Sequence, residues 1–482
     1  MTSVRLCASA MVLLCASLIT LPVSAQQAPD RSKPPAAGPA PALKVPPVQK
    51  RTLSNGLNVW VVEMHEVPVV DVTAIVKSGA ATDPTGKYGL ASFTAAMLDE
   101  GAGSRDALQL SDAIDFLGAS LSTGSSWDSS SVNLHAMVSK LDAALPIFAD
   151  VLLNPAFSQS EMDRVRKQRL TSLLQTRDNA SALASASFAR TVFGPRHRYG
   201  TPSIGNEVSN GEMTVSELKQ FHSTYYQPQN AYLLVVGDVT PDAIMPKLEK
   251  ALGGWKNVGT VPKPTLPATP QHGAREIILV DKPGAAQSAI RMGWVGVARN
   301  NADYFVIDVM NTVLGGSFTS RLNMNLREDK GYAYGASSSF DMRGTPGPFV
   351  AAANVQTDKT VESLAEFFKE IEGMKTPMSA PDLTRARNLE ALSFPAAFET
   401  TSGVASNLAE LAVFGLPESF FSEYVPKIQA VNAADVERAA KQYLQSDKFA
   451  VVVVGDLTKI EKGIRAANFA PVRIVTVDEI LK

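Results

Sequence analysis

The chain has 482 residues, of which 45% are hydrophobic and 19% are charged, so it is long enough to bury more than one core. Its 45 Lys and Arg residues against 47 Asp and Glu residues give a formal net charge of −2, which argues against nucleic acid as a partner and provides no broad attraction to acidic membranes. We expect a globular protein of two to four domains.

The N-terminus has the pattern of a secretory signal. Arg5 precedes an apolar run from Leu6 to Val23, and small residues end the run at Ser24-Ala25, which predicts a signal peptide over 1–25. A membrane anchor is the alternative reading, but Ser, Thr and Pro residues interrupt the run, which falls short of the ~20 clean apolar residues of a spanning helix. We therefore expect export, with no stable membrane insertion after signal cleavage.

Cysteine usage points to the same compartment. Cys7 and Cys15 both lie inside the predicted signal, so the mature chain would have no disulfide, no Cys-ligated zinc and no thiol nucleophile. Export without disulfides suits the periplasm of a Gram-negative bacterium. The following stretch, 26–50, is rich in Pro and Ala and too poor in large apolar residues to bury a core, which predicts a linker.

The first stretches predicted to fold are two runs rich in β-branched residues. Predicted helices and strands then follow one another along the chain. The first helix, over 89–100, has apolar residues at Leu90, Phe93 and Met97, the spacing of a helix that packs on one face. Hydrophobic periodicity, capping residues and turn signals predict strands at 57–62, 69–76, 119–123, 131–138 and 231–238 and helices at 108–117, 142–153, 160–176 and 215–225.

The strand at 231–238 recurs near the C-terminus. Residues 449–456 repeat its Val-rich phrase ending in Gly-Asp, shifted by 218 positions, and the same shift carries Val59–Val62 onto Ile277–Val280 and the helix at 215–225 onto 433–443. Three matches in register indicate duplication. We predict an α+β fold of two homologous halves, 51–260 and 275–482, joined by a linker at 261–274, each an antiparallel sheet with helices packed on one face.

Several phrases give the chain a resemblance to the M16 (pitrilysin, or insulinase-type) zinc peptidases. They are the duplicated halves, the final Val-Gly-Asp strands, Leu314-Gly315-Gly316-Ser317-Phe318-Thr319-Ser320-Arg321-Leu322 and Leu326-Arg327-Glu328-Asp329-Lys330-Gly331-Tyr332-Ala333-Tyr334. The resemblance covers nearly the whole mature chain and implies the M16/LuxS-like metallohydrolase fold.

Active members of that family carry His-x-x-Glu-His on the first helix, where two His share a face and bind zinc while the Glu takes a proton from the metal-bound water. In the matching phrase, Gly89–Met97, these three positions hold Ser92, Ala95 and Ala96. A later Glu completes the family's site, and 77 positions after Ala96 this chain has Leu173. None of these residues is a practical zinc ligand, so we expect no metal or other cofactor bound by this chain.

The second half keeps what the first half lacks. Active members supply an Arg and a Tyr, seven residues apart, that reach the substrate over the zinc, and Arg327 and Tyr334 match that spacing and context. An Arg can hold a peptide carbonyl or carboxylate, and a Tyr hydroxyl can donate to an oxyanion. The structural alternative is a surface ion pair of Arg327 with Glu328 or Asp329 and a Tyr334 packed at a sheet edge.

Three functions compete at this point. The first is the zinc-less subunit of a two-chain M16 peptidase that acts on peptide substrates, in which a zinc-bearing partner performs the chemistry and this chain supplies Arg327 and Tyr334 in trans. The second is a non-enzymatic scaffold or peptide-binding protein. The third is a hydrolase with a rebuilt metal site, which would require convergence of the chain's scattered histidines, His65, His135, His197, His222 and His272.

Overall fold

The computed structural model describes residues 38, 46–269 and 273–481. By its own contacts the chain divides into Met1–Ala40 and Pro41–Lys482, and the fold below is that of the second unit. The predicted signal peptide and most of the predicted linker lie outside the described residues, as does His272. Of the helices within the described ranges, none combines the length and apolar character that crossing a bilayer requires.

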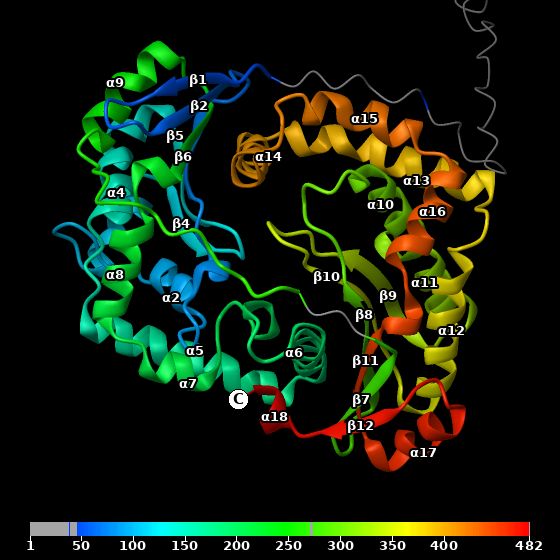
Figure 1. The fold of residues 1–482 in the computed structure, drawn as a ribbon. Helices are drawn as coiled ribbons and strands as arrows, with labels where there is room; N and C mark the ends of the chain where they lie inside the picture. Colours follow the sequence, from blue (N-terminus) through cyan, green and yellow to red (C-terminus); the bar gives the residue numbers. More distant parts are fainter. Residues whose placement is uncertain (1–37, 39–45, 270–272, 482) are drawn as a thin grey trace, which may run out of the picture. The chain divides into compact units, whose positions relative to one another are not determined.

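Two six-stranded sheets form the framework, one in each half of the sequence (Figure 1). The first has the strand order β1-β2-β6-β3-β5-β4 and the second β12-β7-β11-β8-β10-β9. The strands of the first are β1 (Gln49–Thr52), β2 (Asn58–Glu63), β3 (Val69–Val76), β4 (Ser120–Ser125), β5 (Ser130–Met137) and β6 (Ala231–Gly237). Those of the second are β7 (Glu276–Asp281), β8 (Gln287–Val295), β9 (Ala333–Phe340), β10 (Pro348–Gln356), β11 (Ala450–Gly455) and β12 (Val472–Val475).

The register of the strands confirms the duplication. Val61 pairs with Val235 in the first sheet, and adding 218 to both numbers gives Leu279 and Val453, which pair in the second. The two sheets therefore have the same order from their second strand onward. They differ at one edge, where β1 comes from the N-terminus of its half and β12 from the C-terminus.

The predicted fold class, α+β with two halves, is confirmed, but the sheets are mixed instead of purely antiparallel. β3 is antiparallel to both β5 and β6, whereas β2 runs parallel to β6 and β7 runs parallel to β11 and β12. The returning strands β6 and β11 arrive after a long helical connection, which permits a parallel pairing that a tight hairpin forbids. Their sequence, a continuous apolar run, already fits burial on both faces better than a half-exposed antiparallel strand.

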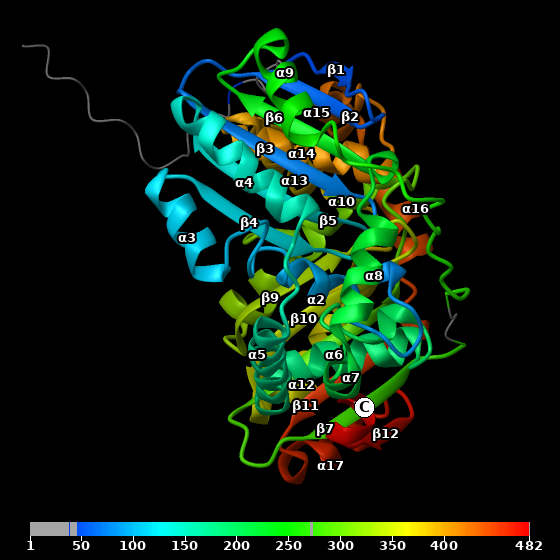
Figure 2. The ribbon, with the colours of Figure 1, turned by 90° about the vertical axis from the view of Figure 1, so that its left-hand side faces the viewer.

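Helices of the first half begin at the capping side chains that its sequence offers, among them Asp106, Ser158, Asn179 and Thr214. Figure 2 looks onto α4 and α9 in front of the first sheet. The helices are α2 (Leu90–Ala96), α3 (Ala107–Phe116), α4 (Leu141–Leu153), α5 (Gln159–Asp178), α6 (Ala180–Phe193), α7 (Glu207–Glu212), α8 (Val215–Tyr225) and α9 (Pro241–Leu252). The first is shorter than the predicted 89–100, because tight turns at Met97 and Leu98 follow it.

The second half repeats this layout with more helix. Its helices are α10 (Tyr304–Asn311), α11 (Arg321–Asn323), α12 (Thr360–Gly373), α13 (Ala380–Ser393), α14 (Thr401–Phe414), α15 (Phe420–Ala430), α16 (Ala433–Tyr443), α17 (Leu457–Ala467) and α18 (Val477–Leu481). Two π-helical turns, η5 (Thr312–Gly316) and η6 (Met324–Asp329), lie between α10 and β9.

One helix of each half packs against the sheet of the other half. Helix α6 packs on β8 and β11 of the second sheet, and α14 packs on β3 and β6 of the first (Figure 1). Alternation along the strand explains how both faces are filled: Ile278 and Val280 belong to the same apolar cluster as α6, while Ile277 and Leu279, also fully buried, point the other way. The prediction of helices on one face was therefore incomplete.

Candidate functional site

The N-terminus of α2 is fixed by a buried ion pair. The Asp83 carboxylate accepts hydrogen bonds from the backbone N–H groups of Gly89 at 2.7 Å and Ala91 at 2.8 Å, where the helix dipole favours an anion. Arg198 donates to the same carboxylate from Nη2 at 2.8 Å and from Nε at 3.0 Å. Burial raises the pKa of Asp83, and attraction to Arg198 opposes that rise. This pair holds α2 in one orientation.

The first of the vacated ligand positions is engaged by a second buried arginine. Arg169, on α5, donates from Nη2 to Ser92 Oγ at 2.9 Å and to the carbonyl oxygens of Ile204 at 2.9 Å and Gly89 at 3.2 Å. Its Nε donates to Asn210 Oδ1 at 2.7 Å. Only 8% of Arg169 is exposed, and this burial lowers its pKa to about 10, so the guanidinium is charged at neutral pH.

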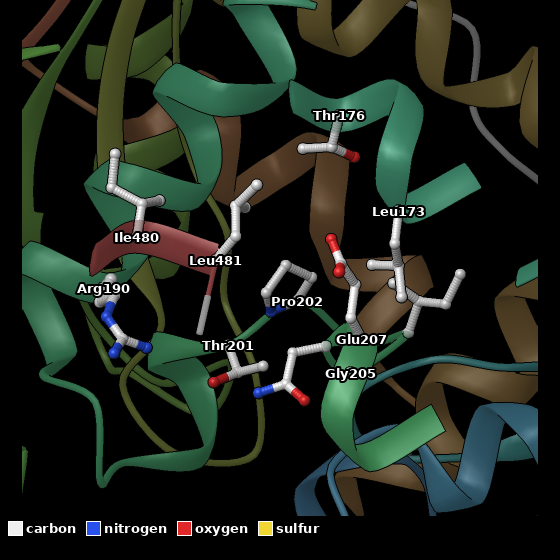
Figure 3. Close-up of a pocket in the computed structure, with 11 residues that line it drawn as sticks. Leu173, Thr176, Arg190, Thr201, Pro202, Gly205, Glu207, Ile480 and Leu481 are labelled. Carbon is white, nitrogen blue, oxygen red and sulfur yellow. The ribbon is translucent and has the colours of Figure 1, made fainter. Parts of the chain in front are cut away.

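The other vacated positions are filled by packing. Ala95 is buried against the first sheet, where its carbonyl oxygen accepts from Thr123 Oγ1 at 2.8 Å, and Ala96 is half-buried at the edge of the core. Leu173 lies one turn beyond Arg169 on α5 and lines a small cavity of about 50 Å³ with Ile204 and residues of the C-terminal helix α18 (Figure 3). Ala95 and Ala96 thus stand where the resembling active enzymes have the Glu and the second His of the helix. Leu173 stands where they have the later Glu.

The donor set at this place does not fit zinc. Protein zinc ligands are imidazole, thiolate and carboxylate groups. The four vacated positions offer a single hydroxyl, that of Ser92, and it accepts a hydrogen bond from the Arg169 guanidinium. Within residues 46–269 and 273–481 no group of three or more His, Cys, Asp or Glu residues converges as metal ligands would.

The predicted Arg327 and Tyr334 pair is brought together on the second half. The chain turns between them at Gly331, whose φ of 64° is open to glycine at no steric cost, and the backbone N–H of Tyr332 donates to Leu326 O at 2.8 Å. The Arg327 guanidinium carbon lies 5.0 Å from the centroid of the Tyr334 ring and 4.8 Å from that of Phe318. Cation–π contact therefore holds the three side chains as a cluster.

This cluster faces solvent. Tyr334 is 85% exposed and Phe318 is 61% exposed, so Tyr334 is not packed at the sheet edge as the structural alternative requires. Arg327 does make the ion pair of that alternative, since its Nε lies 3.1 Å from Glu328 Oε1, but an exposed pair of this kind contributes little to stability. An arginine and a tyrosine are thus presented side by side and open to a ligand.

Comparison with known families decides the relationship. The sequence model described as "Insulinase (Peptidase family M16)" matches residues 59–194, and the one described as "Peptidase M16 inactive domain" matches residues 212–390. The chain belongs to the M16 family.

Relatives of this M16 chain are similar over most of its length. An uncharacterized zinc protease of Rickettsia bellii is 24% identical over 407 residues, which span 83% of this chain and 96% of that protein. The crystal structure of a peptidase M16 inactive domain from Pseudomonas fluorescens has a TM-score of 0.77 at 24% identity, covering 85% of this chain and 98% of that one. A protease from Helicobacter pylori has a TM-score of 0.80 at 22% identity, covering 85% and 100%. These two structures share the fold of this M16 chain.

The described histidines of this M16 chain do not rebuild a metal site. His65 hydrogen-bonds Asp238 and Glu63, which raise its pKa, and His135 lies 3.1 Å from Asp71. His197 is buried and His222 is half-buried, each against aromatic rings, and desolvation lowers the pKa of both. Each of the four has its own structural surroundings: His65 and His197 lie in loops, His135 on β5 and His222 on α8.

Arg169 and the Asp83–Arg198 pair are the site residues that sequence reasoning missed. One signal was available: Arg169 follows Ser92 by 77 positions, the same separation as that between Ala96 and Leu173. Arg169 and Leu173 are therefore one turn apart on α5, just as Ser92 and Ala96 are one turn apart on α2. The 77-residue separation leads from Ala96 to the apolar Leu173, whereas from Ser92 it leads to the cationic Arg169.

Proposed function

We propose that this chain is the non-zinc-binding subunit of a heterodimeric M16 metallopeptidase. In this assembly a zinc-bearing M16 partner hydrolyses a peptide, and Arg327 and Tyr334 of this chain contact that peptide. The observation that carries the proposal is the contrast between the two halves: the α2 site has no metal ligands, while the Arg327–Tyr334 pair is assembled and open to solvent.

The role of each residue follows from its chemistry. Arg327 can donate charge-assisted hydrogen bonds to a peptide carbonyl or carboxylate once it leaves its weak contact with Glu328. The Tyr334 hydroxyl can donate to the oxyanion that develops when water attacks the scissile carbonyl, and donors of this kind contribute most when they are held in place beforehand. The cation–π contact between the two side chains supplies that positioning.

The test is a three-way peptidase assay with this chain alone, a zinc-bearing M16 chain alone and their mixture. We expect cleavage well above that of the zinc chain only in the mixture, and loss of the gain with Arg327→Ala or Tyr334→Phe. Arg385→Ala is the matched control, because Arg385 is also an exposed arginine of the second half in an ion pair with a nearby acid. Unchanged activity on mixing would refute the proposal.

A scaffold or peptide-binding role would give a different pattern. It predicts stable peptide binding by the lone chain that both substitutions leave unchanged, with no gain in cleavage.

The proposal also includes export to the periplasm, supported by the signal-like sequence at 1–25 and by cysteines confined to it. Fractionation of cells that express the full chain, with N-terminal sequencing of the mature protein, tests that part.

A further inference from the structure

The exposed cluster of Phe318, Arg327 and Tyr334 is built from three separate segments of the second half. Phe318 lies in the loop after η5, Arg327 lies in η6, and Tyr334 lies near the start of β9. The contacts between their side chains are mostly at the surface, where cation–π contacts are at their weakest. Such contacts align side chains, but they do not fix the backbone segments from which the side chains project. A donor that serves a developing oxyanion must be held in place beforehand, so the position of these segments matters.

The strand ladder does not hold Tyr334 firmly. β9 is the edge strand of the second sheet, paired on one side only, with β10. The register of that pairing shifts by one residue at Tyr334 and Gly335, which together face the single residue Asn354. An extra residue of this kind is a β-bulge, which interrupts the ladder and turns a side chain in a new direction. The direction of Tyr334 therefore depends on what lies against the free edge of β9.

The segment that carries Arg327 is anchored independently of β9. Asn325, on η6, donates from Nδ2 to Glu366 Oε2 and Glu370 Oε1 on α12, both at 2.7 Å. The Lys330 N–H donates to Asn325 O at 3.0 Å, five residues back, which closes a π-helical turn. η6 is thus fixed on α12, and the cluster needs a connection from η6 to the other two segments.

Asn323 makes both connections. It is the last residue of α11 and directly precedes η6, and only 5% of it is exposed. Its Nδ2 donates to Phe318 O at 2.7 Å, and its Oδ1 accepts from the backbone N–H of Ala336, two residues beyond Tyr334, at 3.2 Å. The same Oδ1 lies 3.7 Å from the place that a Cβ on Gly335 would take, so the amide lies against the bulge. One side chain thus joins the loop of Phe318 and the free edge of β9 to the start of η6.

An amide side chain suits this joint. The joint needs one donor for a carbonyl and one acceptor for an N–H, and an amide offers both, whereas a carboxylate offers acceptors only and an aliphatic side chain offers neither. Because Asn323 is buried, the loss of either partner would leave a polar group unpaired away from water, which is costly. The two hydrogen bonds therefore set the spacing of the three segments.

We propose that Asn323 is a positioning residue for the Arg327–Tyr334 pair. Its bond to Ala336 places Tyr334 and its bond to Phe318 places that ring, so the Tyr334 hydroxyl has a fixed place relative to the Arg327 guanidinium before a peptide binds. Asn323 is buried, so it acts through the segments that it joins and does not itself touch the peptide. The inference rests on the proposed function for what the pair does, and adds a residue whose loss should disable the pair while both of its side chains remain.

Fluorine NMR of the full chain labelled with fluorotyrosine tests the arrangement without a partner or a peptide. The Tyr334 signal is assigned by its loss in Tyr334→Phe, and Arg327→Ala shows how far it moves when the neighbouring cation is absent. Asn323→Leu is close in size to the native side chain and removes both hydrogen bonds. It should move the Tyr334 signal toward its position in Arg327→Ala and leave the other tyrosine signals unchanged. A Tyr334 signal that stays in place in the folded Asn323→Leu chain would overturn the inference.

The mixture with a zinc-bearing M16 chain gives the second readout. The Tyr334 hydroxyl acts on an oxyanion that develops only in the transition state, so its displacement lowers kcat and kcat/KM together. Asn323→Leu should lower kcat of the mixture about 10- to 100-fold, the cost of misplacing a catalytic group by roughly 1 Å. A rise in KM with kcat unchanged would overturn the inference, because it would assign the effect to peptide binding.

A conservative variant separates the two hydrogen bonds. Asn323→Asp keeps an acceptor for the Ala336 N–H and loses the donor to Phe318 O. It should therefore retain more of kcat than Asn323→Leu does, with a Tyr334 signal closer to the native position. Equal losses in the two variants would count against the inference, which assigns the placement of Tyr334 to the bond with Ala336.

Asn230→Leu is the matched control for stability. Asn230 is also a buried amide, in the first half, and its Nδ2 donates to Ser78 Oγ at 3.0 Å and to Tyr225 O at 2.9 Å. This variant loses a comparable pair of buried hydrogen bonds and should leave the Tyr334 signal and kcat unchanged. A loss of kcat as large as that of Asn323→Leu would assign the effect to general stability and overturn the inference.

Failure of this inference is distinguishable from failure of the proposed function. A gain in cleavage on mixing that Asn323→Leu leaves unchanged would leave the heterodimer standing and remove Asn323 as a positioning residue. A displaced Tyr334 signal in Asn323→Leu, with no gain on mixing from the unsubstituted chain, would remove the heterodimer and leave the arrangement of the cluster.

Discussion

Replacement of Arg169 by alanine tests whether the vacated zinc position has become a structural joint. Arg169 connects three parts of the first half: α5, on which it lies, the N-terminal turn of α2 through Ser92 and Gly89, and the segment before and within α7 through Ile204 and Asn210. Arg169→Ala removes the cation that donates to all four of these acceptors. We expect it to be among the most destabilising single substitutions on α5.

The magnitude follows from what the substitution leaves behind. Each buried acceptor left without a donor costs ~1–3 kcal/mol. Asn210 Oδ1 loses its donor, whereas Ile204 O keeps the Asn210 side-chain amide and Gly89 O keeps the Phe93 N–H. Alanine favours the helix slightly more than arginine does, so helix propensity works in the opposite direction. Partial access of water to Ser92 limits the total, and we expect a decrease of about 1–3 kcal/mol in the free energy of unfolding.

Urea denaturation followed by circular dichroism measures this difference, and Arg164→Ala on the same helix is the control. Arg164 pairs with Glu100 and Glu161 at the surface, where such ion pairs contribute ~0–1 kcal/mol. Arg169→Lys should recover only part of the loss, because an ammonium cannot reproduce the fork of donors that a guanidinium offers. A cost of Arg169→Ala no larger than that of Arg164→Ala would refute the reasoning.

Three other outcomes are expected. Restoring His, Glu, His and Glu at the four vacated positions should not give stoichiometric zinc by elemental analysis while the Arg169 cation remains. The same variant should bind zinc once Arg169 is also replaced by Leu. Tight zinc binding with Arg169 present would contradict this. Gly315→Ala should weaken the gain in the mixed peptidase assay, because a Cβ at that position would lie 2.3 Å from the Ser338 backbone nitrogen on the strand that carries Tyr334; Gly211→Ala, with open space around its Cβ, should not. Asp308→Asn should raise the melting temperature at pH 8: the pKa of Asp308 is raised on folding from 3.8 to about 6, so its ionised form disfavours the folded state by up to about 3 kcal/mol above pH 6. That advantage of the variant should shrink as the pH falls toward 4, and an advantage independent of pH would exclude this cause.

Repetition and hydrophobic pattern were sufficient to predict the duplicated fold. The helix at 433–443 coincides with α16, and the 218-residue shift matches the strand register of both sheets. The exchange of α6 and α14 was not predictable in the same way. Helix α6 is rich in Ala and Ser and has no strong apolar stripe. The sequence of such a helix does not indicate which of two sheets it will cover.

The candidate site was likewise predictable from the sequence only in part. The positions without ligands and the seven-residue spacing of Arg327 and Tyr334 are local facts that the sequence contains. The Arg169 network depends on contacts between residues 35 to 80 positions apart, and a cavity that Asp308 lines depends on α10, α14 and the end of β9 meeting. Long-range polar contacts of this kind have no periodicity to reveal them.

The way the vacated site is filled bears on how the two halves divide the work. If the ligands had been lost by neutral drift alone, a polar hole between α2 and α5 would remain, and refilling it with His and Glu would be a short step. Instead, a buried guanidinium with four acceptors now joins these helices, so a return of the metal would first have to break these hydrogen bonds. The exposed Arg327 and Tyr334 are under no such structural demand, since their ion pair and ring contact lie at the surface. Stability therefore accounts for the residues at the first site and not for those at the second, which is why the functional proposal rests on the second.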